Sequence, residues 1–157
     1  MKKFDSIGKF LCEYVSRLFA YQVERKDGSS KVFIKAFVYS SLVEQLDKEE
    51  FMFSSIGVPE AYEILKKEKS LKRGKEIYPS FVMAWIGYIM KYFAYTRGIS
   101  EKRVCECVKP NELYAMYEAY HSLDNEAVVT RIIDAKNINL SLENLGLLRK
   151  IYRGHEN

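Results

Sequence analysis

The chain has 157 residues, of which 48% are hydrophobic and 14% aromatic, and its formal net charge is only +4. A chain of this length usually forms one domain, and it buries roughly 70% of the surface that its unfolded state exposes. Such a core needs no disulfide or metal for stability, and the apolar content excludes an intrinsically disordered chain. We therefore expect residues 1–157 to form a single domain.

The three cysteines, Cys12, Cys105 and Cys107, show no spacing typical of a disulfide framework. An odd number of cysteines without such a framework indicates a reducing compartment. The residues after Met1 lack the long apolar stretch and the small-residue cleavage site of a signal peptide. These observations predict a cytoplasmic protein.

Two helices are predicted before residue 48. Apolar residues recur at helical spacing over residues 4–22, and every four residues over 31–47, at Ile34, Val38, Leu42 and Leu46. The Asp27-Gly28 pair between these stretches is typical of a turn. Because residues 32–39 are also rich in β-branched and aromatic side chains, a short β-hairpin near residues 21–39 is the alternative.

A further helix is expected from Pro59 to Leu65, since proline is well suited to the first helical turn. The stretch from Lys66 to Lys75 is the most basic part of the chain, and Glu68 is its only acid. We interpret it as an exposed charged linker. The alternative is a patch that binds phosphates or an acidic partner.

The stretch 79–97 is apolar on almost every side of a helix, and Gly98 is expected to end it. Such a helix belongs at the centre of a bundle. The small residues on one side of it, where a second backbone could approach closely, are Ala84, Gly87 and Ala94. Its length would also suit a membrane span, but Lys91 and Pro79 argue against one, because a charge inside a bilayer is costly. We expect a buried helix and no membrane segment.

Helix-starting residues mark the rest of the chain. Ser100 is expected to cap a short helix that ends near residue 108. Pro110 is expected to start another helix, and Asp124 to cap a third. Residues 138–142 alternate like a short strand, and a final helix capped by Ser141 is the alternative. Together these elements predict a mainly α fold, a compact orthogonal helical bundle around the central apolar helix 79–97.

Two groups of residues are candidates for binding or catalysis. The first is the aromatic face of the central helix and the cations near it: Trp85, Tyr88, Lys91, Tyr92 and Arg97. Aromatic side chains clasp partner peptides or stack on nucleic-acid bases, although at helical spacing they are also typical of a core. Lys91 and Arg97 are expected to reach solvent or an acidic partner, because long cations near an apolar helix end require one.

The second group surrounds His121, the only histidine before the C-terminal tail. A histidine acts as a general base when a carboxylate orients it beside a nucleophile, and Asp124 and Ser122 could take these roles. A small enzyme built on His121, Asp124 and Arg131 is therefore one hypothesis. The competing interpretation is structural, since serine and aspartate are the usual helix caps.

No metal or cofactor site is expected. Cys105-Glu106-Cys107 has no second pair of ligands, and on a helix its two cysteines point about 200° apart. The chain also has no glycine-rich phosphate loop. The helix, turn and helix across residues 97–108 suggest DNA binding, although Glu101 and Glu106 weaken the attraction of this region to phosphates.

One stretch resembles a known group of proteins. Residues 78–88, Tyr-Pro-Ser-Phe-Val-Met-Ala-Trp-Ile-Gly-Tyr, and residues 120–124, Tyr-His-Ser-Leu-Asp, are similar to segments of small, largely uncharacterised proteins of Gram-positive bacteria. That group typically shows Tyr-Pro-x-x-Val-Met-x-Trp-Ile-Gly-Tyr, and the likeness ends near Ala135. This chain departs from the group at Phe93, where a tryptophan is common. Genes for the group often lie near toxin–antitoxin or mobile-element genes.

The resemblance implies an antitoxin-like role in binding a protein partner, with no established activity and no catalytic residues. We therefore expect a non-enzymatic protein-interaction module without a cofactor. A DNA-binding transcriptional regulator is the alternative, and a small enzyme using His121 and Asp124 is a further one. The candidate partner-binding residues are Trp85, Tyr88, Lys91, Tyr92, Arg97, His121, Asp124 and Arg131.

Overall fold

Eight α-helices make up the part of the chain that the computed structural model describes, residues 1–48, 55–69, 71 and 74–140. They are α1 (Ser6–Arg25), α2 (Ser30–Val38), α3 (Ser41–Asp47), α4 (Val58–Glu68), α5 (Ser80–Arg97), α6 (Glu101–Cys107), α7 (Pro110–Tyr120) and α8 (Asn125–Ala135). None of these residues forms a β-strand, so the predicted all-α bundle is confirmed. The strand or helix expected over residues 138–152 lies largely outside the described residues.

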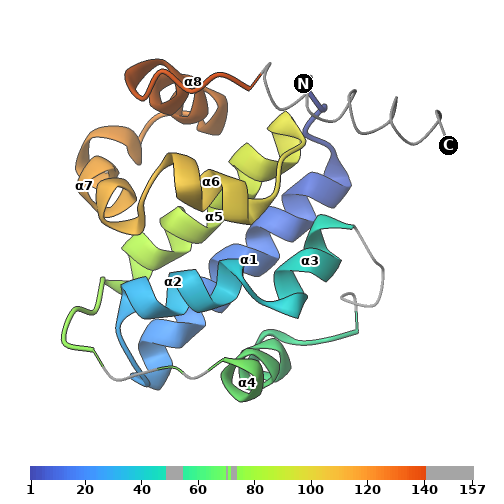
Figure 1. The fold of residues 1–157 in the computed structure, drawn as a ribbon, viewed down its shortest axis with the longest axis vertical. Coiled ribbons are helices and arrows are strands. Elements are labelled where there is room, and N and C mark those ends of the chain that lie inside the picture. The colour runs from blue at the N-terminus through green and yellow to red at the C-terminus, as the bar shows by residue number, and fades with distance from the viewer. Residues whose placement is uncertain (49–54, 70, 72–73, 141–157) are drawn as a thin grey trace, which may run out of the picture.

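Helices α1 and α5 form the central pair of the bundle, and Figure 1 shows them side by side through the middle of the molecule. They run antiparallel, because Gly8 near the start of α1 lies against Tyr95 near the end of α5. Helix α4 packs on α1, whereas α6, α7 and α8 pack on α5. Every residue from Ile89 to Thr96 is buried. The 79–97 helix is therefore central as predicted, but it shares this place with α1.

The two central helices approach closely at Gly87. A Cβ atom at this position would lie 2.9 Å from Cγ of Phe19 and 3.0 Å from the carbonyl oxygen of Val15. One residue away along α1, the Ser16 hydroxyl donates a hydrogen bond of 2.8 Å to the Ala84 carbonyl oxygen. The backbone approach predicted from the small residues of α5 is thus confirmed at Ala84 and Gly87.

Helix ends follow local chemistry at the predicted positions. The hydroxyl of Ser100 accepts a hydrogen bond from the Arg103 amide and caps α6. The carboxylate of Asp124 does the same for α8. Gly98 ends α5 with φ of 65°, a left-handed conformation that glycine adopts without strain.

The region between residues 21 and 47 differs from both predictions. The β-hairpin near residues 21–39 is wrong, because residues 21–25 belong to α1 and residues 30–38 form α2. The single helix over 31–47 is also wrong, because it breaks into α2 and α3 at Ser40. The Ser40 hydroxyl donates to the Phe37 carbonyl oxygen at 2.6 Å and accepts from the Val43 amide at 3.3 Å. This serine satisfies backbone groups on both sides of the break, while the apolar spacing continues through it.

Candidate functional site

Aromatic side chains of α5 and α7 meet at the molecular surface. The ring centroid of Phe81 lies 5.5 Å from that of Tyr117, and Trp85 meets the same tyrosine edge-to-face at 5.6 Å. Phe81 is 60% exposed and Tyr114 is 42% exposed, whereas Trp85 and Tyr117 are half-buried. We call these four residues, Phe81, Trp85, Tyr114 and Tyr117, the aromatic surface.

Helical spacing and packing explain why these rings converge. Phe81 and Trp85 are four residues apart on α5, and Tyr114 and Tyr117 are three apart on α7, so each pair shares one helix face. The two helices pack against each other. The buried ring of Tyr78 stacks on the Tyr114 ring with centroids 4.2 Å apart and thereby fixes its position. The aromatic surface is therefore built on rigid elements rather than on loops.

A pocket of about 230 Å³ lies between α5 and α7 beside these rings. The residues that line it are Pro79, Phe81, Val82, Tyr114, Ala115, Tyr117 and Glu118. Glu118 is the only charged residue among them, and its side chain forms no ion pair or hydrogen bond within the described part of the chain. The pocket thus combines aromatic walls with a solvent-exposed carboxylate.

His121 contributes to the edge of the aromatic surface. Its ring stacks on Tyr117 with centroids 4.5 Å apart and planes 11° apart. Its Nδ1 lies 2.8 Å from the Tyr117 carbonyl oxygen, and the Asp124 carboxylate accepts from the Ala127 amide as the cap of α8. The structure therefore gives His121 and Asp124 separate local partners, in place of the direct pairing that the enzyme hypothesis uses.

Two residues of the first predicted group, Tyr92 and Arg97, take part in a polar cluster between α5 and α8. Arg97 donates two hydrogen bonds to the Glu126 carboxylate, at 2.9 Å and 2.6 Å, and the Tyr92 hydroxyl donates to the same carboxylate at 3.0 Å. The Arg97 guanidinium holds the pKa of Glu126 below its usual range. Burial and the bond to Glu126 raise the pKa of Tyr92 to about 12. The acidic partner expected for Arg97 is thus Glu126, and the cluster fastens α8 to the bundle.

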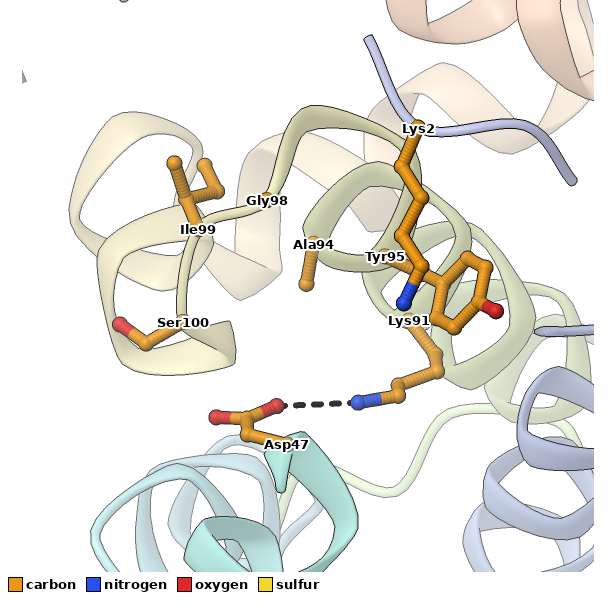
Figure 2. A pocket seen from close by; sticks show the side chains of 8 residues that line it. All are labelled: Lys2, Asp47, Lys91, Ala94, Tyr95, Gly98, Ile99 and Ser100. Atoms are coloured by element: carbon orange, nitrogen blue, oxygen red, sulfur yellow. Dashed lines mark hydrogen bonds and ion pairs between the residues drawn. The ribbon is translucent and has the colours of Figure 1, made fainter. Parts of the chain in front are cut away.

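Lys91 points into the interior rather than toward a binding surface. Its side chain is 2% exposed, and its ammonium donates a hydrogen bond of 2.9 Å to the Asp47 carboxylate at the end of α3. Figure 2 shows these two side chains pointing toward each other. Both line a pocket of about 280 Å³. Lys2 reaches into the same pocket, with its ammonium 4.1 Å from the centroid of the Tyr95 ring. The acidic partner expected for Lys91 is therefore Asp47.

Glu101 lies behind Lys91 as a fully buried carboxyl group. Its side chain is 0% exposed, one carboxyl oxygen lies 3.9 Å from the Lys91 ammonium, and neither oxygen has a hydrogen-bond partner in the described chain. Burial raises the pKa of Glu101 to about 8, and the Asp47 charge adds to the rise while Lys91 opposes it. The carboxyl group is therefore mainly protonated at neutral pH, and Lys91 is paired chiefly with Asp47.

The environment of the buried Cys12 thiol does not favour its use as a nucleophile. Cys12 is fully buried, and burial together with the Glu101 carboxyl raises the pKa of its thiol. A thiol that stays protonated is a weak nucleophile. Asp47, Lys91 and Glu101 thus form a polar cluster that joins α3, α5 and α6.

The eight predicted site residues fall into separate groups. Trp85 and His121 both contact Tyr117, which the sequence-based set did not include. Tyr92 and Arg97 share Glu126, which was also missed. The other four residues belong to neither group. Asp124 caps α8, and Lys91 is buried in the interior. Tyr88 is half-buried on α5, and the Arg131 guanidinium lies 6.0 Å from the Tyr120 ring centroid.

Phe81, Tyr114 and Tyr117 are the main residues that sequence reasoning missed as binding candidates. The three- and four-residue spacing from Tyr114 through Tyr117 to His121 places these rings on one face of α7 and its C-terminal end. That spacing was the available signal. The exposure of Phe81 had no local signal, because it depends on which helices cover the start of α5.

The polar side chains of the candidate DNA-binding region, residues 97–108, contact other residues of the chain. Glu101 at the start of α6 is buried, and Arg103 forms an ion pair of 3.4 Å with Glu106. The Lys102 ammonium lies 5.1 Å from the Tyr39 ring centroid. In the basic stretch, Lys66 lies in α4 and binds Asp27 at 3.3 Å, whereas Lys72 and Arg73 lie outside the described residues.

Cys105 is buried and Cys107 is partly exposed, which agrees with the opposite directions predicted for them on a helix. Within the described ranges, no group of three or more His, Cys, Asp or Glu side chains is placed to hold a metal ion. No helix in these ranges combines the length and the apolar character that crossing a membrane requires.

The chain matches no protein-family model, no curated protein and no solved structure.

Proposed function

We propose that this chain is a protein-interaction module that binds its partner through the aromatic surface of α5 and α7. The observation that carries the proposal is the exposure of Phe81, at 60%, within a cluster of contacting rings. Aromatic side chains are enriched at protein interfaces and supply much of their binding energy. Burying an exposed phenylalanine under a partner contributes roughly 1.5–3 kcal/mol.

Preorganisation strengthens this assignment. Tyr117 contacts Phe81, Trp85 and His121, and Tyr114 is stacked on the buried Tyr78. Rings held in this way lose little conformational freedom on binding, so more of the contact energy appears as affinity. The resemblance of residues 78–88 and 120–124 to proteins often encoded near toxin–antitoxin genes suggests the class of partner. The finer proposal is therefore an antitoxin-like role, with a cognate toxin as the partner.

The geometry offers less support for the two other functions. His121 and Asp124 are each engaged with backbone groups of their own helix ends. The one arginine of α6, Arg103, is paired with Glu106. We therefore rank protein binding above catalysis and above DNA binding.

The test is co-expression of the chain with the products of its neighbouring genes, followed by affinity purification and gel filtration. We expect a stable complex with the wild-type chain and at least a tenfold loss of affinity for Phe81→Ser. The matched control is Tyr39→Ser, which removes a 55%-exposed ring far from α7 in the sequence and should retain the complex. Salt-dependent binding of the free chain to DNA, with no protein partner recovered, would favour the regulator instead.

A further inference from the structure

The pocket beside the aromatic surface has a charge that points to the chemistry of its occupant. Glu118 is exposed, lies on the lining of the pocket, and forms no ion pair or hydrogen bond in the described chain. Its neighbours on the lining are uncharged, so the Glu118 carboxylate is the one charged group of the pocket lining. A cation is therefore the complementary occupant.

The walls of the pocket favour the same occupant. Phe81 and Tyr117 have ring planes 53° apart with centroids separated by 5.5 Å, and Tyr114 completes the lining beside them. The faces of aromatic rings attract cations, and arginine stacks on them through its planar guanidinium group. A carboxylate that lines the same pocket can accept two parallel N–H bonds from the guanidinium. Aromatic faces and a carboxylate together suit arginine better than lysine.

The size of the pocket indicates a side chain rather than a free small molecule. Its volume is about 230 Å³. Sites for whole small molecules usually hold roughly 300–1,000 Å³. A pocket below that range, open beside an exposed aromatic surface, is suited to one projecting side chain of a larger partner.

We propose that the pocket formed by Phe81, Tyr114, Tyr117 and Glu118 receives an arginine side chain of the protein partner. This inference rests on the proposed function, because three of the four residues of the aromatic surface also line the pocket. Glu118 selects the positive charge, and the rings select the planar guanidinium. Arginine is among the residues that most often dominate interface energies.

The test uses three amidated tripeptides that differ only in the central residue, which is arginine, lysine or norleucine. Each is titrated into the ¹⁵N-labelled full chain, and chemical shifts are followed by NMR. The expected result is saturable binding of the arginine peptide in the millimolar range, centred on amides of α7 and the start of α5. Binding of the lysine peptide should be at least threefold weaker, and the norleucine peptide should not bind.

Two variants test the assigned roles. Glu118→Gln and Phe81→Leu should each weaken binding of the arginine peptide by about fivefold or more. The control Glu63→Gln removes an exposed carboxylate of α4 and should leave binding unchanged. All three positions are at the surface, and an unchanged far-UV circular dichroism spectrum verifies the fold. Equal binding of the arginine and norleucine peptides, or an arginine affinity unaffected by Glu118→Gln, would overturn the inference.

The same variants separate this inference from the proposed function. A co-purifying partner that is lost with Phe81→Ser but binds Glu118→Gln at full affinity means that the aromatic surface is the interface and that the pocket takes no arginine. Loss of the partner with Glu118→Gln, together with arginine-selective peptide binding, supports both. A partner that binds Phe81→Ser and wild type equally well contradicts the proposed function itself.

Discussion

The ammonium group of Lys91 lies 2.9 Å from the carboxylate of Asp47, with the lysine 2% exposed and the aspartate side chain 24% exposed. This pair joins the central helix α5 to the C-terminal end of α3 (Figure 2). It also explains how the mainly apolar helix α5 carries a buried lysine. Burying the Lys91 ammonium without a partner would destabilise the folded state by several kcal/mol. The fold therefore depends on Asp47 lying beside it.

The Lys91→Ala variant should be strongly destabilised. Removal of the side chain breaks the pair and leaves a cavity beside Glu101, and we expect the free energy of unfolding to fall by about 3 kcal/mol. Urea denaturation measures this. The control is Lys66→Ala, which removes an ion pair with Asp27 where the lysine is 43% exposed and should cost less than about 1 kcal/mol. Equal effects of the two variants would show that the Lys91 pair is not structurally important.

The buried carboxyl group of Glu101 should give the protein an unusual dependence of stability on pH. Its pKa is about 8 in the folded protein against an ordinary value of 4.5, so between these values the folded state binds more protons than the unfolded state. Stability should therefore decrease as pH rises from 5 to 8, by up to roughly 1 kcal/mol per pH unit from this group, and then level off. The Glu101→Gln variant mimics the protonated form and should lack this slope.

The measurement is the urea midpoint of both proteins at several pH values from 5 to 9. Carboxylates with lowered pKa values, such as Glu126, lose their stabilising effect only below about pH 4.5, so they do not enter this range. Other groups that titrate between pH 5 and 8 cancel in the difference between the two proteins. Parallel profiles for wild type and Glu101→Gln would contradict the assignment.

Gly87→Ala tests the close contact between the central helices. The new Cβ atom would lie 2.9 Å from the Phe19 ring and 3.0 Å from the Val15 carbonyl oxygen, so the Phe19 ring and the adjacent backbone of α1 must shift. We expect a net loss of about 1–3 kcal/mol from overpacking, despite a gain of about 1 kcal/mol in helix propensity. Thermal denaturation provides the measurement. Ala115→Gly, at an exposed position in α7, calibrates the propensity difference in this protein. A stabilised Gly87→Ala protein would mean that α1 and α5 are further apart than described.

The Arg97–Glu126 pair should show a measurable coupling energy. A double-mutant cycle with Arg97→Met and Glu126→Gln is expected to give about 1–2 kcal/mol, because the bond is bidentate and Arg97 is only 10% exposed. The exposed pair Arg103–Glu106 should give less than about 0.5 kcal/mol. The folded pKa of Glu126 is lowered, so the coupling should be present at pH 7 and disappear as pH falls below about 4.5. Coupling of the same size at pH 7 and at a pH where Glu126 is fully protonated would exclude an ionic origin.

The parts of the fold that depend on local chemistry were predictable from the sequence. Ser100 and Asp124 satisfy amides at the starts of α6 and α8, and Gly98 takes the left-handed conformation at the end of α5. Each of these effects involves residues within four positions of one another. The break at Ser40 escaped prediction, because the four-residue apolar spacing is the same in one long helix as in α2 followed by α3.

The partners of the candidate site residues were not predictable, because they depend on the packing of distant segments. The sequence indicated that Lys91 and Arg97 reach solvent or an acidic partner. The carboxylates that they contact are distant in the sequence, because Asp47 lies 44 positions from Lys91 and Glu126 lies 29 from Arg97. Many carboxylates in the chain were equally eligible. Phe81 lies on the same apolar stripe as buried residues, and it is exposed because α7 covers only part of its surroundings.

The most direct test of the central claim is site-specific photo-crosslinking of the chain to its partner in the native host. The photoreactive residue p-benzoylphenylalanine is placed at position 81 in the aromatic surface, and at position 39 as the control. Mass spectrometry then identifies the crosslinked protein. We predict one dominant adduct from position 81 with the product of a neighbouring gene, and none from position 39. Adducts of equal yield from both positions, or from position 39 alone, would contradict the assignment of the interface to α5 and α7.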